Sequence, residues 1–195
     1  TERTEVFHYF GLDVKDSSSF EEAFKKFLIP EIIEDYRAED RPEKMTVQRY
    51  VRIREAPQHL VIQLNRFEYD MQTQQRVKIN TKFEFPSTFD LATCKEDSES
   101  TIYRLNGVVT HSGTAEGGHY VSYVKINGNW IKFDDGNVSK VTTDEFNRAT
   151  QGTDDTFSEE LIASAYLLFY TQNEDVATPA VIPPELKTKI EEENE

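Results

Sequence analysis

The sequence is poor in cysteine, with a single one, Cys94, among 195 residues. One thiol excludes a disulfide framework and a cysteine-rich zinc site within the chain, and it is typical of a reducing intracellular compartment. No apolar run approaches the roughly 20 residues that a membrane-spanning helix needs. Basic residues are also scarce, 22 against 36 acidic ones. The resulting net charge of −14 disfavours nucleic acid as the main partner.

The two ends of the chain differ from its middle. The N-terminal residues 1–5 do not form a signal peptide, and there is no initiating Met. We therefore expect an intracellular protein of the nucleus and cytoplasm, without a membrane partner, and a segment of a longer polypeptide. Residues 173–184 hold three prolines and are expected to form a linker, followed by an acidic helix over 184–195.

What is abundant is apolar and aromatic, 37% and 12% of the residues, which is enough for a packed core. Apolar spacing predicts a helix over 20–28, begun by a capping box at Ser19 and Glu22 and ended by Pro30. A second helix is expected at 143–149. Residues 34–46 are charged without a period and are expected to be a surface connection.

Strand patterns dominate the rest of the chain. Asn127-Gly128 is a two-residue hairpin signal, and residues 66–76 resemble a hairpin connection. A proline ends the segment 83–86, which is expected to be an edge strand. The full set of expected strands is 6–14, 47–53, 60–64, 77–79, 83–86, 103–110, 120–126, 129–133 and 163–171. An antiparallel sheet with a few helices is an α+β fold.

His119 is the first candidate catalytic residue. It follows Gly117-Gly118 at the start of an expected strand, and pairing across the 127–128 turn brings it beside Asp134 and Asp135. An imidazole and a carboxylate in reach of each other are two members of a nucleophile–base–orienter triad. Successive strand residues point to opposite faces, so the sequence leaves open which aspartate orients the imidazole. A surface histidine beside a loop carboxylate pair is the alternative interpretation.

The chain offers no convincing nucleophile. Acidic residues surround Cys94, whereas a reactive thiolate needs positive surroundings, so we expect this cysteine in a surface loop. His111 opens a nine-residue, glycine-rich loop that ends at His119, longer than a tight hairpin requires. A metal site of His111, Glu116 and His119 is disfavoured, because the spacing fits neither helical nor tight-turn ligand sets.

At these residues the sequence closely resembles the ubiquitin-specific proteases, papain-like thiol hydrolases that cleave after the C-terminal glycine of ubiquitin. The resemblance is greatest to the herpesvirus-associated ubiquitin-specific protease and its fungal relatives, which share the stretch at 66–70 and the C-terminal helix. The matching segments are 57–67, 78–86, 103–113, 117–121, 130–135 and 165–170.

The resemblance implies a role for each matching residue. It makes His119 the general base, Asp134 its orienter and Asp135 a neighbouring helper. The loop 112–118 would be a blocking loop over the channel for the ubiquitin tail. The residues implied to line or flank that channel are His111, Gly117, Gly118, Tyr120, Arg66 and Phe67. No metal or other cofactor is implied, since the zinc ribbon of many relatives is absent.

The resemblance also implies an organisation. Residues 1–172 would be the C-terminal half of the catalytic domain, an antiparallel palm and part of the fingers without the helical thumb, and 173–195 the linker and helix. The family's cysteine box is absent, so the N-terminal half would be a partner, together with ubiquitin and ubiquitinated proteins. The leading hypothesis is a deubiquitinating thiol protease whose isolated segment is inactive. The alternative is a non-catalytic ubiquitin-binding or scaffold module.

Overall fold

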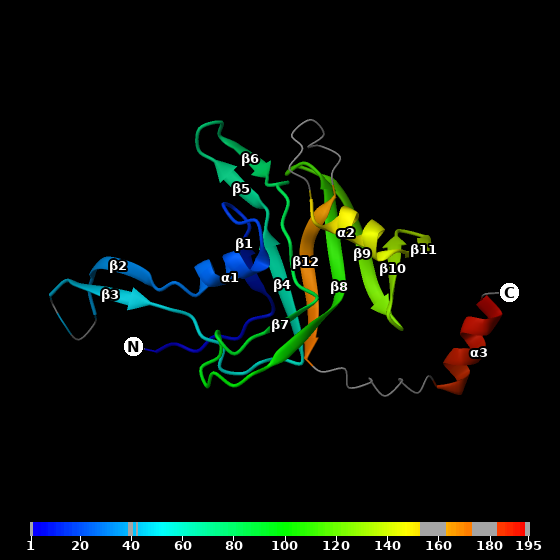
Figure 1. Ribbon diagram of the computed structural model, residues 1–195, viewed down its shortest axis with the longest axis horizontal. Coiled ribbons are helices and arrows are strands. Elements are labelled where there is room, and N and C mark those ends of the chain that lie inside the picture. The colour runs from blue at the N-terminus through cyan, green and yellow to red at the C-terminus, as the bar shows by residue number, and fades with distance from the viewer. Residues whose placement is uncertain (1, 39–40, 42, 153–162, 173–182, 194–195) are drawn as a thin grey trace.

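A computed structural model describes residues 2–38, 41, 43–152, 163–172 and 183–193. A large sheet forms the centre, with strands in the order β1-β4-β12-β8-β9-β10-β11 and β7 paired on β8 (Figure 1). All of its pairs are antiparallel except β1 with β4. Its strands are β1 (Phe10–Asp13), β4 (His59–Asn65), β7 (Thr88–Asp90), β8 (Ile102–Gly113), β9 (Gly118–Ile126), β10 (Asn129–Asp134), β11 (Asn137–Val141) and β12 (Ser164–Gln172).

The remaining elements are two separate hairpins and three helices. Each hairpin pairs only with itself among the described strands. Within the described residues no helix is long and apolar enough to cross a membrane. These elements are β2 (Glu31–Tyr36) with β3 (Met45–Arg49), β5 (Phe67–Asp70) with β6 (Gln75–Lys78), α1 (Phe20–Phe27), α2 (Thr143–Thr150) and α3 (Pro184–Glu193).

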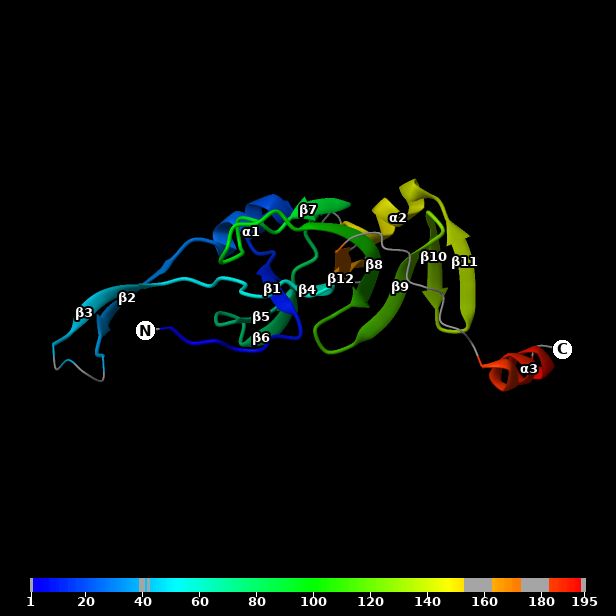
Figure 2. The ribbon, with the colours of Figure 1, turned by 90° about the horizontal axis from the view of Figure 1, so that it is seen from below.

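Helix α1 lies over one face of the sheet, and its start shows how the local sequence specifies it (Figure 2). The hydroxyl of Ser19 accepts a hydrogen bond from the backbone N–H of Glu22 at 3.3 Å. The Glu22 carboxylate accepts from the backbone N–H of Ser18 at 2.9 Å, one residue before the position that a capping box requires. The predicted capping box is therefore only half formed. Phe20 and Phe24 are buried against the sheet.

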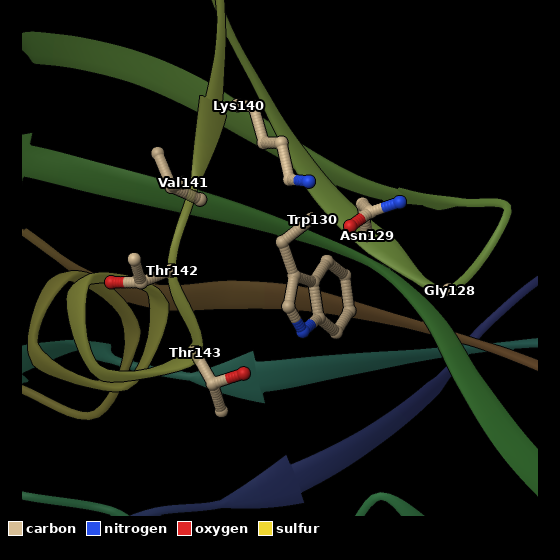
Figure 3. Close-up of a pocket in the computed structure, with 7 residues that line it drawn as sticks. All are labelled: Gly128, Asn129, Trp130, Lys140, Val141, Thr142 and Thr143. Atoms are coloured by element: carbon tan, nitrogen blue, oxygen red, sulfur yellow. The ribbon is translucent and has the colours of Figure 1, made fainter.

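Helix α2 covers the same face near β9 and β10 (Figure 2). Thr142 and Glu145 form a complete capping box at its start. The ring of Phe146 stacks on Trp130 with centroids 3.9 Å apart and planes 6° apart, and it meets Tyr123 edge-on. Beside the indole lies a hollow of about 360 Å³ (Figure 3). Its lining residues are Gly128, Asn129, Trp130, Lys140, Val141, Thr142 and Thr143.

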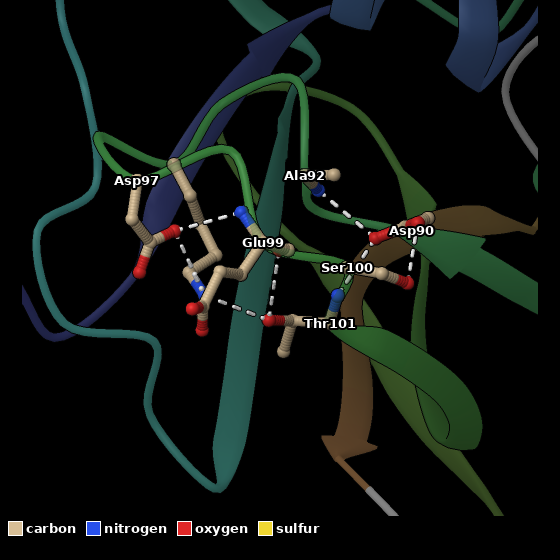
Figure 4. Close-up of polar contacts among 7 residues, drawn as sticks. Asp90, Ala92, Asp97, Glu99, Ser100 and Thr101 are labelled. Carbon is tan, nitrogen blue, oxygen red and sulfur yellow. Dashed lines mark hydrogen bonds and ion pairs between the residues drawn. The ribbon is translucent and has the colours of Figure 1, made fainter.

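The loop between β7 and β8 is held by side chains that accept backbone hydrogen bonds (Figure 4). Asp90 Oδ1 accepts from the N–H groups of Ala92 and Thr101 at 2.9 and 2.8 Å, and these bonds hold the pKa of Asp90 below its ordinary value. The ammonium of Lys95 donates to the Thr101 hydroxyl at 3.0 Å and pairs with Asp97 at 3.1 Å. These contacts fix the loop that contains Cys94.

The structure confirms the α+β fold and most predicted elements, and it corrects three. Residues 31–36, within and beside the expected surface connection, form strand β2, which pairs with β3. Residues 83–86 are not an edge strand: Glu84 makes only an isolated bridge to Ser19, and the segment after Pro86 provides β7. Strand β11 was not predicted. The predicted linker at 173–182 lies outside the described residues.

Candidate active site

His119 and Asp134 lie at neighbouring ends of β9 and β10, because the tight turn at Asn127-Gly128 returns the chain directly beside itself. Both turn residues have positive φ, 48° and 77°, as this kind of hairpin turn requires. Nε2 of His119 lies 2.6 Å from Oδ1 of Asp134. The other carboxylate oxygen of Asp134 pairs with the ammonium of Lys132 at 2.7 Å. The structure therefore brings together the two residues that the sequence predicted.

The hydrogen bonds and charges around this pair shift both pKa values in the direction that favours the charged imidazolium and carboxylate. The hydrogen bond to Asp134, followed by the charges of Asp135 and Asp134, raises the pKa of His119. Hydrogen bonds from Lys132 and then His119 lower the pKa of Asp134. An ionised carboxylate only accepts hydrogen bonds, so it fixes the proton of a neutral imidazole on Nε2. The lone pair is then on Nδ1, and the side chain is 48% exposed, open to an incoming group.

Asp135 differs from its neighbour in conformation. It leaves the strand with φ of 50°, which ends the alternation of β10. Ligand atoms of His119, Asp134 and Asp135 lie within 4.8 Å of one another, a spacing compatible with a metal ion. The hydrogen bond from Nε2 to Asp134 accounts for the closest of these approaches. Asp135 acts on His119 through its charge.

The glycine-rich connection before His119 is shorter than predicted. The ladder between β8 and β9 continues through Ser112↔His119 to Gly113↔Gly118, so the loop comprises only residues 114–117. A Cβ on Gly118 would lie 2.0 Å from the Ser112 carbonyl oxygen and 2.4 Å from Nε2 of His111. Only glycine fits there. Gly117 has no other atom within 4 Å of such a Cβ.

Three aromatic rings and one imidazole gather beside this hairpin. His111 is 3% exposed, and its ring lies 4.7 Å from Tyr120 and 5.4 Å from Phe67. Tyr166 contacts both Phe67 and Tyr120, at 5.7 and 5.9 Å. Burial, followed by the charge of Lys78, lowers the pKa of His111, which is therefore neutral at pH 7. Tyr166 was not among the predicted site residues; it lies at a bulge of β12, between the paired residues Ala165 and Leu167.

Comparison with known proteins identifies the family of the chain. Residues 1–170 match the family model described as ubiquitin carboxyl-terminal hydrolase. The chain belongs to this family.

Ubiquitin carboxyl-terminal hydrolase 7 of Caenorhabditis elegans is 34% identical over 189 residues, which cover 88% of this chain and 16% of that protein. Ubiquitin carboxyl-terminal hydrolase 15 of Saccharomyces cerevisiae is 30% identical, over 98% of this chain and 19% of its own length. A chain of the SAGA Ubp8/Sgf11/Sus1/Sgf73 DUB module bound to ubiquitin aldehyde matches with a TM-score of 0.68 and 30% identity, over 86% of this chain and 36% of that one. The segment thus spans less than a fifth of the two curated relatives.

Arg66 in this ubiquitin carboxyl-terminal hydrolase segment does not line an exposed channel, which corrects the sequence-based expectation. Its side chain is fully buried. Nε donates to the Ala165 carbonyl at 2.7 Å, and Nη1 donates to the carbonyls of Ile79 and Thr81 at 2.8 and 3.2 Å. Burial lowers the pKa of Arg66 to about 10, so it stays charged at neutral pH. Its position next to a buried strand was the one signal of a structural role.

Cys94 is also placed differently from the prediction. It has 0% exposure and lies in the core, and burial raises the pKa of its thiol. Its loop joins β8 at Ile102, whereas Ser112, the partner of His119, lies toward the other end of this 12-residue strand. At about 3.3 Å per residue the two ends of β8 are roughly 35 Å apart. This thiol cannot serve His119 in this fold.

Proposed function

We propose that this segment supplies the general base and its orienting carboxylate to a deubiquitinating thiol hydrolase, which cleaves peptide and isopeptide bonds after the C-terminal glycine of ubiquitin. The observation that carries the proposal is the 2.6 Å contact between Nε2 of His119 and Asp134. Family membership over residues 1–170 supports the reaction. The similar solved chains, described as bound to monoubiquitin and to ubiquitin aldehyde, support ubiquitin as the partner.

In the proposed reaction the nucleophile is a cysteine thiol from outside these 195 residues. Nδ1 of His119 takes the thiol proton, and the thiolate attacks the carbonyl carbon of the scissile bond. The imidazolium returns its proton to the leaving amine as the C–N bond breaks, which leaves a thioester on the ubiquitin glycine. Water, deprotonated by the same imidazole, then hydrolyses the thioester and regenerates the thiol. Asp134 and Asp135 stabilise the imidazolium in both halves.

We also propose that the hairpin before His119 forms one wall of a slot for the ubiquitin tail. Gly117, Gly118 and Tyr120 are exposed, and Tyr120 is 51% exposed. The buried ring of His111 lies beside Tyr120 and next to Gly118. A wall with no side chain at Gly117 and Gly118 leaves room for a narrow, glycine-ended peptide. Closeness to the herpesvirus-associated subgroup and a nuclear and cytoplasmic location stay predictions.

Kinetics of a longer enzyme test the proposal. A protein that joins this segment to a thiol-bearing segment should hydrolyse a fluorogenic ubiquitin C-terminal amide. Replacing His119 by Ala should lower kcat about 10²–10⁴-fold, the usual contribution of a general base. His59→Ala is the matched control, because His59 is exposed on β4 and bonds only to Thr171 among the described residues. Unchanged kcat in the His119 variant would place the base elsewhere.

The burial of Cys94 favours a second candidate for the segment alone, a ubiquitin-binding module without catalysis. A ubiquitin probe with a thiol-reactive C-terminus tests whether the isolated segment holds a nucleophile of its own. The isolated segment should bind ubiquitin in calorimetry and yet escape covalent capture. Capture through Cys94 would contradict the placement of the nucleophile outside the segment.

A further inference from the structure

The β5–β6 hairpin is joined to the main sheet through the ring of Phe67, which packs on His111 and Tyr166, and through polar contacts. Its two strands pair only with each other among the described strands. On one side Lys15 reaches Glu68 at 2.8 Å through an exposed ion pair. On the other side Lys78, the last residue of β6, donates from Nζ to the carbonyl oxygen of His111 at 2.7 Å. This second contact links the hairpin to β8 close to the proposed tail slot.

The His111 carbonyl lies where the pairing between β8 and β12 ends. Strand β12 begins at Ser164, the cross-strand partner of His111, so β8 has no β12 neighbour beyond this point within the described residues. A backbone carbonyl in such a place needs a donor, because an unsatisfied buried carbonyl is costly. The Lys78 ammonium provides one. It therefore fixes the backbone of β8 at the last residue before the glycine hairpin wall.

The ring of His111 contacts exposed residues of the proposed slot. It contacts Tyr120, which neighbours the base in sequence, and its Nε2 lies 2.4 Å from the position of a Cβ on Gly118. Nδ1 of the same ring is buried and has no hydrogen-bond partner among the residues that the structure describes. Packing against Tyr120 and Phe67, together with the backbone held by Lys78, keeps this imidazole in place.

Lys78 occupies an unfavourable place for a cation. It is half-buried, and burial together with the charge of Arg66 lowers its pKa to about 8. A lysine without a structural role would lie at the surface, where it would avoid both the burial and the repulsion by Arg66. Its contact with the His111 carbonyl, beside the slot, gives a reason for its presence.

We propose that Lys78 is a positioning residue for the ubiquitin tail: it holds the His111 backbone, and through the His111 ring it holds Tyr120 and Gly118 in the geometry that receives the tail. The inference rests on the proposed function. It assigns Lys78 an effect on tail binding and not on the chemistry at His119.

A double comparison by calorimetry at pH 7 tests this. The ligands are intact ubiquitin and ubiquitin that lacks its last two glycines, and the proteins are the 195-residue chain and its variants. Lys78→Met keeps the length of the side chain and removes the donor. It should raise the Kd for intact ubiquitin about tenfold, because the charged hydrogen bond to the His111 carbonyl is lost. The Kd for truncated ubiquitin should stay unchanged. Lys78→Arg, which keeps a donor, should recover part of the loss.

Lys15→Met is the matched control, since it removes the other lysine contact of the same hairpin. It should leave both Kd values within about twofold, as expected for an exposed ion pair. If Lys78→Met raised the Kd for intact and truncated ubiquitin equally, Lys78 would stabilise the fold in general, and the inference would be overturned. Unchanged binding of both ligands would overturn it too. If the unmodified chain does not distinguish the two ligands, the slot itself is wrong, and the proposed function fails separately from the role of Lys78.

Discussion

The imidazole of His119 is bound to Asp134 through Nε2, at 2.6 Å, and this choice of nitrogen has a chemical consequence. The nitrogen that carries the lone pair of the neutral ring is Nδ1, on the side away from the carboxylate. Lys132 occupies the second oxygen of the same carboxylate at 2.7 Å. The aspartate is thus kept ionised and in place, and His119 is ready to accept a proton.

Asp134→Asn should lower the pKa of His119. The hydrogen bond to the Asp134 carboxylate is the largest cause of the raised pKa, and a neutral amide stabilises the imidazolium much less. The ring proton shifts of His119, followed by NMR against pH in the 195-residue chain, measure this. Asp135→Asn is the control and should produce a smaller decrease, because Asp135 acts only through its charge. Equal decreases in the two variants would contradict the assignment of Asp134 as orienter.

The same shifts predict a pH window for stability. A raised pKa of His119 adds stability below its ordinary value near 6.5, and this is lost as pH rises through the raised value. A lowered pKa of Asp134 adds stability above its ordinary value near 3.8, lost as pH falls through the lowered value. His119→Gln should therefore decrease the urea midpoint more at pH 5.5 than at pH 8.5. The opposite order would mean that the pair does not form in solution.

Gly118→Ala and Gly117→Ala should separate packing from slot geometry. A Cβ at Gly118 would collide with the Ser112 carbonyl and with the His111 ring, so the hairpin must move, at about 1–3 kcal/mol. Gly117 has free space and ordinary φ, so unfolding should change by less than ~0.5 kcal/mol. Urea unfolding gives both numbers. Binding of intact ubiquitin should weaken in the Gly117 variant without loss of stability, whereas unaffected binding would exclude Gly117 from the slot.

The sequence was sufficient where local signals fix the structure. The turn at Asn127-Gly128 determines the register of β9 and β10, and the register brings His119 beside Asp134. The turn alone did not decide between the two aspartates, since Asp135 leaves the strand at positive φ, whereas the family resemblance implied Asp134. Strand β2 was missed because all but one of its residues are exposed, and an exposed ribbon needs no alternation of apolar residues.

Burial of polar residues was the other source of error. Arg66 is charged and lies between a buried strand and an exposed hairpin, and this local pattern does not show that three carbonyl oxygens accept hydrogen bonds from it. Cys94 stands among charged residues, yet its thiol is buried, and so is the neighbouring Lys95, whose ammonium bonds to Thr101 and pairs with Asp97. Both errors concern tertiary contacts between segments far apart in sequence, which a local pattern cannot reveal.

Arg66→Met should destabilise the fold strongly. The substitution fills most of the same space but leaves the carbonyls of Ala165, Ile79 and Thr81 without this donor, and each unsatisfied buried group costs about 1–3 kcal/mol. A loss of about 3 kcal/mol or more is expected in urea unfolding. Arg104→Met, on the partly exposed surface of β8, is the comparison and should cost less. An Arg66→Met variant with nearly unchanged free energy of unfolding would contradict the role of Arg66 in connecting β4, β12 and the base of the β5–β6 hairpin.

Phe146→Ala should weaken the far end of the sheet without disturbing His119. Phe146 is 4% exposed and stacks on Trp130 at 3.9 Å, so its removal opens a cavity at about 3–5 kcal/mol. The stack lies beside the 127–128 turn, at the opposite end of β9 and β10 from the His119–Asp134 pair. Urea unfolding should show the loss, while the NMR-measured pKa of His119 in the folded variant stays unchanged. Lys125→Ala removes only a cation above the indole, 5.9 Å from its centroid, and should cost about 0.5–1 kcal/mol. A shifted His119 pKa in the Phe146 variant would show that the two ends of these strands are coupled.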